Sequence, residues 1–332
     1  MRSLSGIQPS GILHIGNYFG ALKQFVDLQD KYEGLYFLAD YHALTSNPDP
    51  VKLRENTLNV LLDYLALGLD PKKSIVFLQS DVPCHTELMW ILNNVTPVAL
   101  LERGHAYKDK IAKGLKPNTG LFTYPVLMAA DILMYDTDYV PVGKDQKQHV
   151  EFARDIAIKF NEHYQKEVFK LPNDLIMENV AVVTGVDGEK MSKSYGNMIN
   201  MFVPEKQLKK QVMSIVTDSK TLEESKDPDN NITKIYSLFA TKEELEAMKQ
   251  KFINGNYGYG HAKKELFEKI LDYFSEARKK REKLADNLDY IHEILNEGKI
   301  KANKIAQAKM DVVRKTVGLY KWFIILQVLM QD

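Results

Sequence analysis

Apolar, β-prone runs alternate with helical patterns along the first half of the chain. The runs are nearly continuous in their apolar character, which is typical of strands buried on both faces of a sheet. They lie at residues 35–39, 74–78, 139–142 and 181–184. Between them apolar residues recur at helical spacing, as in Val51–Leu67 after Pro50, where Gly68 ends the pattern. Strands that alternate with helices predict a parallel sheet with helices on both faces.

After about residue 186 the strand pattern stops and only helical spacing remains. Leu284, Leu288, Ile291 and Leu295 fall on one helical face, and Gly298 is expected to cap that helix at its carboxyl end. The predicted fold class is therefore α/β, with a parallel-sheet domain followed by a smaller, mainly helical domain.

Composition narrows the possible functions of these two domains. The 332 residues include 44 Lys plus Arg and 44 Asp plus Glu, so the net charge is 0. A neutral chain is not a protein that coats DNA through bulk charge, although a local basic face can still bind nucleic acid. A hydrophobic fraction of 45% is enough for a packed core and excludes wholesale disorder.

The cysteine count and the apolar runs bear on the compartment. The single cysteine, Cys84, cannot form an internal disulfide or a cysteine-rich zinc site, which favours a reducing environment. The first residues lack the apolar run of a signal peptide, and the longest apolar stretch, 322–330, is too short to cross a bilayer. We expect a soluble, cytoplasmic protein with no membrane partner.

A turn-rich loop follows a short strand at the N-terminus. We call residues 8–17 the first loop; it contains Gly11 and Gly16, and an apolar helical pattern follows it. A strand, a tight loop and a helix start together favour an anion site, where His14 and Asn17 can donate to phosphate oxygens. The glycines alone are more typical of an ordinary strand-to-helix turn.

A second polar loop follows the α/β half. We call residues 187–194 the second loop; it carries Lys190, Ser192, Lys193 and Ser194. Two lysines three residues apart can both reach one polyphosphate. Taken alone, the segment is equally typical of a solvated charge run.

Together, the two loops resemble the paired signatures of class I aminoacyl-tRNA synthetases. The first signature is usually His-Ile-Gly-His; this chain has Asn17 in the last place, a variant of the tyrosine/tryptophan branch. Further stretches resemble bacterial tryptophanyl-tRNA synthetases, and the likeness extends to about Gly318. These stretches are residues 6–11, 39–45, 123–133 and 141–149.

The resemblance implies a domain plan and a reaction. It implies a Rossmann-like catalytic domain over residues 1–185, joined by the C-terminal helix and tail at 297–332. Residues 186–296 would recognise the anticodon. The expected enzyme is a tryptophan–tRNA ligase that forms tryptophanyl-adenylate and pyrophosphate from L-tryptophan and ATP, then charges tRNA-Trp. Mg²⁺ would arrive with ATP, without a protein metal site, and the enzyme would be a homodimer that binds no DNA.

The resemblance also assigns residues to the nucleotide. His14, Asn17, Lys190 and Lys193 would act in catalysis, the two lysines by neutralising the leaving pyrophosphate. No general base is expected, because the tryptophan carboxylate is already ionised. The remaining ATP-binding candidates are Gln8, Pro9, Ser10, Gly16, Gly143, Lys144, Asp145, Val182, Met191, Ser192, Ser194 and Lys110.

Asp131 is the notable residue of the amino-acid side. It lies in the otherwise apolar helical run Val126–Met134, which Pro125 is expected to begin. A carboxylate there needs a partner: either a donor of the protein itself or a ligand N–H, and the resemblance makes that N–H the tryptophan indole. Met128, one turn earlier, would pack on the ring.

The other amino-acid contacts are expected at the carboxyl ends of strands. Tyr124, Gln146 and His42 are candidates for the α-amino group, although His42 is equally consistent with a core histidine. Leu4, Ala39, Val140 and Val142 are candidate pocket walls.

Two segments outside the site remain open. Arg278, Lys279, Lys280, Arg281 and Lys283 form a basic cluster that either touches tRNA phosphates or is a solvated helix face. The apolar segment after Leu319 exceeds the family pattern, and it must pack on the body or a partner, or be disordered.

Three alternative functions remain open at this stage. One is a tyrosyl-tRNA synthetase, which would need phenol-reading groups near Asp131. Another is a paralogue that adenylates tryptophan without charging tRNA. The third is a small nucleotidyltransferase, which would not need residues 186–296.

Overall fold

The computed structural model describes residues 1–332 except 10, 47, 115, 144–146, 177–182 and 320–332. Five parallel strands form one sheet in the order β3-β2-β1-β4-β5. They are β1 (Arg2–Ile7), β2 (Glu33–Leu38), β3 (Ser74–Leu78), β4 (Tyr139–Val142) and β5 (Asn173–Ile176). The predicted parallel α/β sheet is therefore confirmed. The strand order reverses at β1, and ligands of open α/β sheets bind at the carboxyl ends beside such a point.

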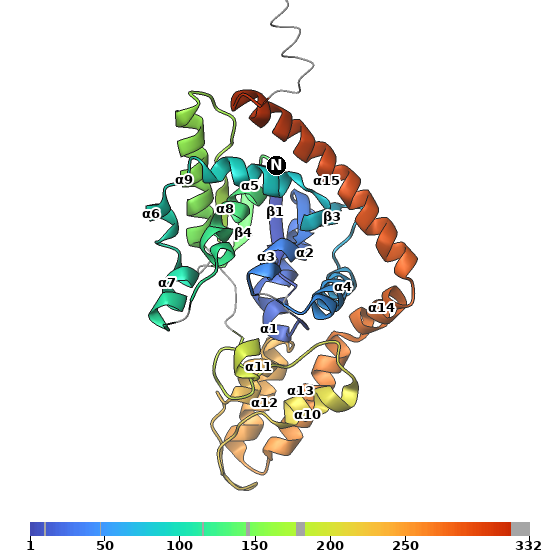
Figure 1. Ribbon diagram of the computed structural model, residues 1–332. Coiled ribbons are helices and arrows are strands. Elements are labelled where there is room, and N and C mark those ends of the chain that lie inside the picture. Colours follow the sequence, from blue (N-terminus) through green and yellow to red (C-terminus); the bar gives the residue numbers. More distant parts are fainter. Residues whose placement is uncertain (10, 47, 115, 144–146, 177–182, 320–332) are drawn as a thin grey trace, which may run out of the picture.

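Helices pack around this sheet and continue into a separate helical part (Figure 1). Those before residue 185 are α1 (Ile15–Asn17), α2 (Lys23–Leu28), α3 (Asp40–Ala43), α4 (Pro50–Ala66), α5 (Cys84–Asn93), α6 (Val98–Leu101), α7 (His105–Ala112), α8 (Thr119–Leu133) and α9 (Lys147–His163). A π-helical turn, Tyr18–Leu22, joins α1 to α2, and short 3₁₀ turns lie at Leu44–Ser46, Gln79–Asp81 and Lys193–Tyr195. The later helices are α10 (Glu205–Met213), α11 (Asn231–Tyr236), α12 (Lys242–Asn254), α13 (Tyr259–Tyr273), α14 (Ser275–Ala285) and α15 (Leu288–Thr316).

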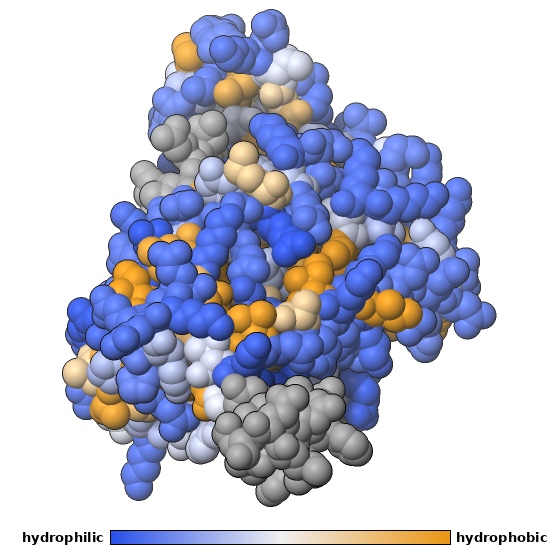
Figure 2. Space-filling model, turned by 90° about the horizontal axis from the view of Figure 1, so that it is seen from above, coloured by the Kyte–Doolittle hydropathy of each residue, from blue (hydrophilic) through white to orange (hydrophobic). Residues whose placement is uncertain are grey.

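The helical part lies at the carboxyl end of the strands. Figure 1 shows α10–α13 beyond α1, while α14 and α15 return along the sheet to its far end. The expected division at 185/186 and 296/297 stays a prediction; the second of these positions falls inside the continuous helix α15. Seen from above in Figure 2, the surface is mostly hydrophilic, with apolar residues in small groups.

The strand predictions differ from the structure near residue 180. Within the run 181–184, residues 181–182 lie outside the described residues, and Thr184 makes only an isolated bridge with Lys190. The fifth strand is β5, which the hydrophobic pattern does not predict. Its first two residues, Asn173 and Asp174, are polar and lie at the edge of the sheet beside β4, where one side of a strand can face water.

Two predicted helix ends are wrong. Helix α8 begins at Thr119 and contains Pro125 in its interior; the Asn118 side chain caps it by accepting from the Leu121 N–H at 2.8 Å. That cap and the buried residues that follow outweigh the backbone hydrogen bond that proline removes. Gly298 does not end a helix either, because α15 continues to Thr316. A Cβ there would overlap the carbonyl oxygen of Val76, so glycine lets α15 lie directly against β3.

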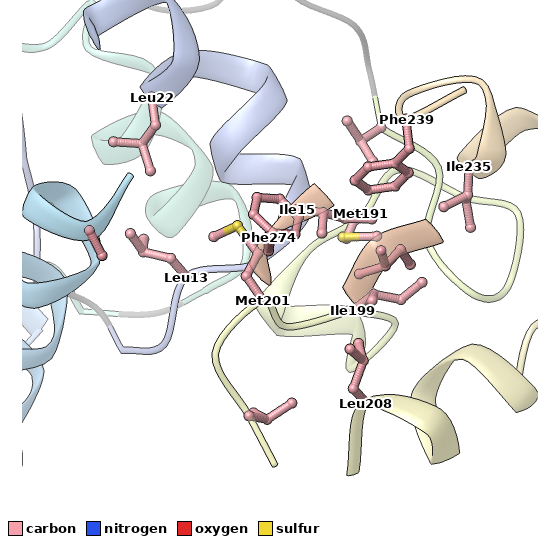
Figure 3. Packing of buried hydrophobic residues seen from close by; sticks show 14 of the residues in the cluster. Leu13, Ile15, Leu22, Met191, Ile199, Met201, Leu208, Ile235, Phe239 and Phe274 are labelled. Atoms are coloured by element: carbon pink, nitrogen blue, oxygen red, sulfur yellow. The ribbon is translucent and has the colours of Figure 1, made fainter. Parts of the chain in front are cut away.

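The core extends through both parts of the molecule. One cluster joins the first loop, α4 and the second loop to the helical part through Leu13, Ile15, Met191 and Phe274 (Figure 3). The other cluster packs α5, α8, α9 and α15 against the opposite side of the sheet. The site candidates lie where these layers meet.

Candidate active site

The first loop leaves β1 and leads into a short helical turn. Asn17 Oδ1 accepts from the His14 backbone N–H at 3.1 Å, and the Ile15 N–H donates to the Ile199 carbonyl at 3.0 Å. A Cβ on Gly16 would lie 2.8 Å from His14 Nδ1, so the glycine makes room for the imidazole. The first loop is therefore anchored to the segment after the second loop before any ligand binds.

The imidazole of His14 is buried and close to a positive charge. It is 5% exposed, and burial together with the Lys193 ammonium lowers its pKa to about 4. At neutral pH the ring is therefore uncharged. If it contacts phosphate as expected, it does so as a hydrogen-bond donor rather than as a cation.

The second loop reaches across to the first. The Lys193 ammonium donates to the Gly11 carbonyl at 3.0 Å, and burial lowers its pKa. The Met191 side chain is 5% exposed and packs in the core with Leu13 and Ile15 (Figure 3). Ser192 and Ser194 face each other with their Oγ atoms 2.8 Å apart. Two segments about 180 residues apart in the sequence thus form one polar surface.

Asp131 is 1% exposed and receives donors from three other elements. Its Oδ2 lies 2.8 Å from His42 Nε2, and its Oδ1 lies 2.6 Å from His85 Nδ1 and 2.8 Å from Gln79 Nε2. Although burial opposes ionisation, the histidines hold the pKa of Asp131 below its usual range. His85 Nε2 lies 2.8 Å from the Tyr135 hydroxyl, which extends the network.

Gln79 and His85 are site residues that the sequence pattern does not predict. Gln79 directly follows β3, and His85 lies in the first turn of α5. A polar residue at the carboxyl end of a buried strand is the signal that could have found Gln79. His85, at 0% exposure, looks like a core residue until its partner is seen.

The other amino-acid candidates surround this cluster. The Tyr124 hydroxyl lies 2.9 Å from His149 Nε2, and its ring lies edge-on to His42. Gln8 donates to the His42 carbonyl at 3.4 Å. The candidates that share the surrounding hydrophobic core are Leu4, Ala39, Met128, Val140 and Val142.

Of the remaining predicted site residues, some are not described by the structure and the others lie apart from these contacts. Ser10, Lys144, Asp145, Gln146 and Val182 lie outside the described residues. Lys110 lies on α7, which packs against α8. Pro9 is buried in the first loop, Gly143 follows β4, and Lys190 is exposed on the second loop. Among the residues that the structure describes, no group of His, Cys, Asp and Glu could hold a metal ion.

The basic cluster of α14 is divided between two faces. Arg278 donates to the Met201 and Val203 carbonyls, and Arg281 donates to Asp63. These two arginines are therefore engaged in contacts within the protein. The exposed lysines of the cluster are Lys279, Lys280 and Lys283.

The fold and site define an open α/β protein in which a distant lysine meets the first loop at the carboxyl end of β1, where such proteins bind their ligands. The family described as tRNA synthetases class I (W and Y) matches residues 1–275. The chain is 66% identical over 318 residues to the tryptophan–tRNA ligase of Fusobacterium nucleatum subsp. nucleatum, covering 96% of this chain and 98% of that protein. It is 54% identical over 320 residues to the tryptophan–tRNA ligase of Campylobacter jejuni.

Solved structures agree. The crystal structure of tryptophanyl-tRNA synthetase from Campylobacter jejuni complexed with ADP and tryptophan has a TM-score of 0.92 and 54% identity, and the match covers 96% of this chain and all of that one. The chain therefore belongs to the class I tRNA synthetases of the tryptophan and tyrosine group.

Proposed function

We propose that this chain is a tryptophan–tRNA ligase. It joins L-tryptophan to ATP, releasing pyrophosphate, and transfers the tryptophanyl group of the adenylate to tRNA-Trp. This proposal rests on sequence identities of 66% and 54% to two bacterial tryptophan–tRNA ligases, each over 96% of the chain. The Asp131 network supports it from the chemistry of the pocket.

Asp131 reads the indole N–H in this proposal. A carboxylate offers about four acceptor positions, and three donors from the described residues reach this one. Gln79 and His85 donate to Oδ1, and His42 donates to Oδ2. One acceptor position on Oδ2 therefore remains for the indole. An indole presents one N–H donor and no acceptor, so an ionised, acceptor-only group matches it. Met128 contributes a polarisable contact to the ring.

The two loops hold ATP in this proposal. Lys193 and Lys190 neutralise charge on the departing pyrophosphate, and neutral His14 and the amide of Asn17 donate to phosphate oxygens. Lys193 exchanges the Gly11 carbonyl for phosphate when ATP enters. Mg²⁺ belongs to the substrate, because the described phosphate side offers cations and amides rather than a carboxylate cage. The tryptophan carboxylate attacks as an anion, so no residue is needed to remove a proton.

The remaining partners extend the same proposal. The helical part and the exposed lysines of α14 contact tRNA, and two copies of the chain form a homodimer. Val98 is 61% exposed beside a groove between α6 and α9, whose lining combines apolar residues such as Leu100 and Ile158 with charged ones such as Arg103 and Asp155. This mixed surface is where we propose that a second copy binds. Across the described residues no helix is both long and apolar enough to span a bilayer. We propose a cytoplasmic location.

ATP–pyrophosphate exchange with each amino acid in turn tests the function. We expect exchange with tryptophan alone, followed by charging of tRNA-Trp. Exchange with tyrosine would identify a tyrosyl enzyme instead. Exchange without charging would identify a paralogue that only makes the adenylate.

A further inference from the structure

Arg281 crosses from the helical part to a buried carboxylate on the sheet domain. Its Nε lies 2.5 Å from Asp63 Oδ1, and its Nη2 donates to Asn59 Oδ1 at 2.7 Å. The guanidinium also lies over the Phe202 ring, 5.4 Å from its centroid. The side chain of Asp63 is 2% exposed and that of Arg281 is 21% exposed.

A buried ion pair of this kind contributes little net free energy to folding. Desolvating a carboxylate costs several kcal/mol, and well-packed apolar residues often do as well or better in the same place. Burial raises the pKa of Asp63 to about 6, although Arg281, the Leu13 N–H and Lys193 all favour its ionised form. Arg281 therefore contributes to keeping this carboxyl group charged at neutral pH.

Asp63 in turn acts on the second loop. Burial lowers the pKa of Lys193, and the Asp63 carboxylate opposes that shift. The same carboxylate accepts from the backbone of Leu13 in the first loop. The buried Asp63 carboxylate on α4 thus interacts with Arg281 of α14, with Lys193 of the second loop and with the first loop. These three segments must be aligned around ATP.

The neighbouring arginine fixes the same region from its other side. Arg278 Nη2 donates to the Val203 carbonyl at 2.8 Å and Nη1 to the Met201 carbonyl. Met201 and Phe274 pack beside Leu13 in Figure 3. Helix α14 therefore touches both the chain that leaves the second loop and the helix that carries Asp63.

We propose that Asp63 and Arg281 are positioning residues for adenylate formation: Arg281 of the helical part binds Asp63 of α4, and Asp63 holds in place the first loop, to which Lys193 donates. This inference rests on the proposed role of Lys193 at the pyrophosphate. The helical part is then connected to the leaving pyrophosphate through three charged side chains: Arg281, Asp63 and Lys193.

Four variants test the connection in the full-length protein. Asp63→Asn keeps the shape and removes the charge, Arg281→Gln removes the cation, and Arg281→Lys retains it. Glu282→Gln is the matched control, because it removes an exposed charge one residue away on the same helix. Tryptophan-dependent ATP–pyrophosphate exchange is measured from pH 6 to 10, together with thermal unfolding.

We expect Asp63→Asn and Arg281→Gln to lower kcat on the order of tenfold, with the KM for tryptophan within about twofold of wild type. The alkaline limb of kcat should move to lower pH in Asp63→Asn, because Lys193 loses the opposite charge that supports its protonation. In Arg281→Gln the acid limb should move to higher pH instead, because Asp63 loses the cation that favours its ionised form. Among the described residues, Asp63 and His14 are titratable groups that interact with Lys193, and His14 is neutral throughout this range. Arg281→Lys should recover part of the rate, and Glu282→Gln should match wild type.

An unmoved alkaline limb in a folded Asp63→Asn would overturn the proposal, even if kcat fell, because a structural role predicts loss of rate without a shift. Equal rates in all variants would overturn it too. If Asp63→Asn does not fold, the acid limb decides: it should lie at higher pH in Arg281→Gln than in Arg281→Lys, and equal acid limbs would overturn the proposal. Exchange by wild type with tryptophan, and its loss in Lys193→Ala, tests the proposed function separately.

Discussion

The pocket around Asp131 and the contact around Lys193 differ in how their polar groups are satisfied. Asp131 is fully buried and bonded to donors of α3, α5 and the turn after β3, all within the sheet domain. Lys193 is partly buried, and it donates from the second loop to the Gly11 carbonyl in the distant first loop. The amino-acid side is thus preorganised before substrate arrives, whereas the nucleotide side must exchange partners. The first arrangement suits selectivity, because a preorganised pocket leaves its polar groups unpaired when a wrong amino acid enters. The second arrangement lets Lys193 leave the Gly11 carbonyl and follow the charge that develops on the leaving group.

The largest effect is expected at the nucleotide side. Lys193→Ala should lower the rate constant of adenylate formation by a factor on the order of 10²–10³, the range for losing one charge-stabilising donor. Affinities for tryptophan and ATP should change far less, because the ammonium acts mostly in the transition state. Single-turnover kinetics over a range of ATP concentrations measures this, with Lys206→Ala on exposed α10 as control. Recovery of the wild-type rate at saturating ATP would make Lys193 a ground-state ligand only.

The second largest effect is the pH dependence of stability that comes from His14 on the nucleotide side. The pKa of His14 is lowered from 6.5 to about 4, so between these values the ring gains a proton mainly when the chain unfolds. The free energy of unfolding therefore falls as pH falls through this window. From pH 7 to pH 4 wild type should lose up to ~3 kcal/mol relative to His14→Gln. Urea unfolding at several pH values measures it; parallel curves for the two proteins would contradict the assignment.

The third effect concerns selection of the amino acid. Asp131→Asn keeps one acceptor oxygen but loses the charge, so recognition of tryptophan should weaken by about 1.5–3 kcal/mol. The KM for ATP should stay nearly constant, because the nucleotide side is built from other segments. Exchange assays with tryptophan, tyrosine and phenylalanine measure the preference. An unchanged preference would remove Asp131 from the pocket.

The smallest effect tests how far the preorganised network extends. Tyr135→Phe removes the hydroxyl that bonds His85 Nε2 and leaves every direct contact of Asp131 in place. We expect a loss of about 0.5–1.5 kcal/mol in tryptophan affinity, the net value of one hydrogen bond. Equilibrium binding of tryptophan measures it. A loss as large as that in Asp131→Asn would mean that the carboxylate depends on its outermost partner.

The sequence predicts features that depend on local pattern or on a motif. Continuous apolar runs predict three of the sheet strands, β2, β3 and β4, and the paired loops predict a nucleotide site. Asp131 attracts attention because a carboxylate in an apolar helix needs a donor. That donor set, with Gln79 and His85, depends on which strand end faces which helix, and no local spacing encodes it.

The wrong predictions have the same cause. Gly298 has the spacing of a helix cap, but its role is to let α15 approach the backbone of β3. Arg278 and Arg281 belong to a basic run that looks solvated, yet they turn toward carbonyls and a carboxylate some 75 to 218 residues away in the chain. Tertiary contact, rather than composition, decides the role of each.

The contact at Gly298 also bears on how the chain is made. Among the strands that the structure describes, β3 pairs only with β2, and its outer side is covered by α15, which ends at Thr316. A growing chain finishes β3 long before it reaches this helix; at about 5–20 residues per second the interval is roughly 10–50 seconds. During that time the edge strand stays open to pairing with other chains. A truncation that removes α15 should therefore yield a product that aggregates rather than a smaller soluble domain.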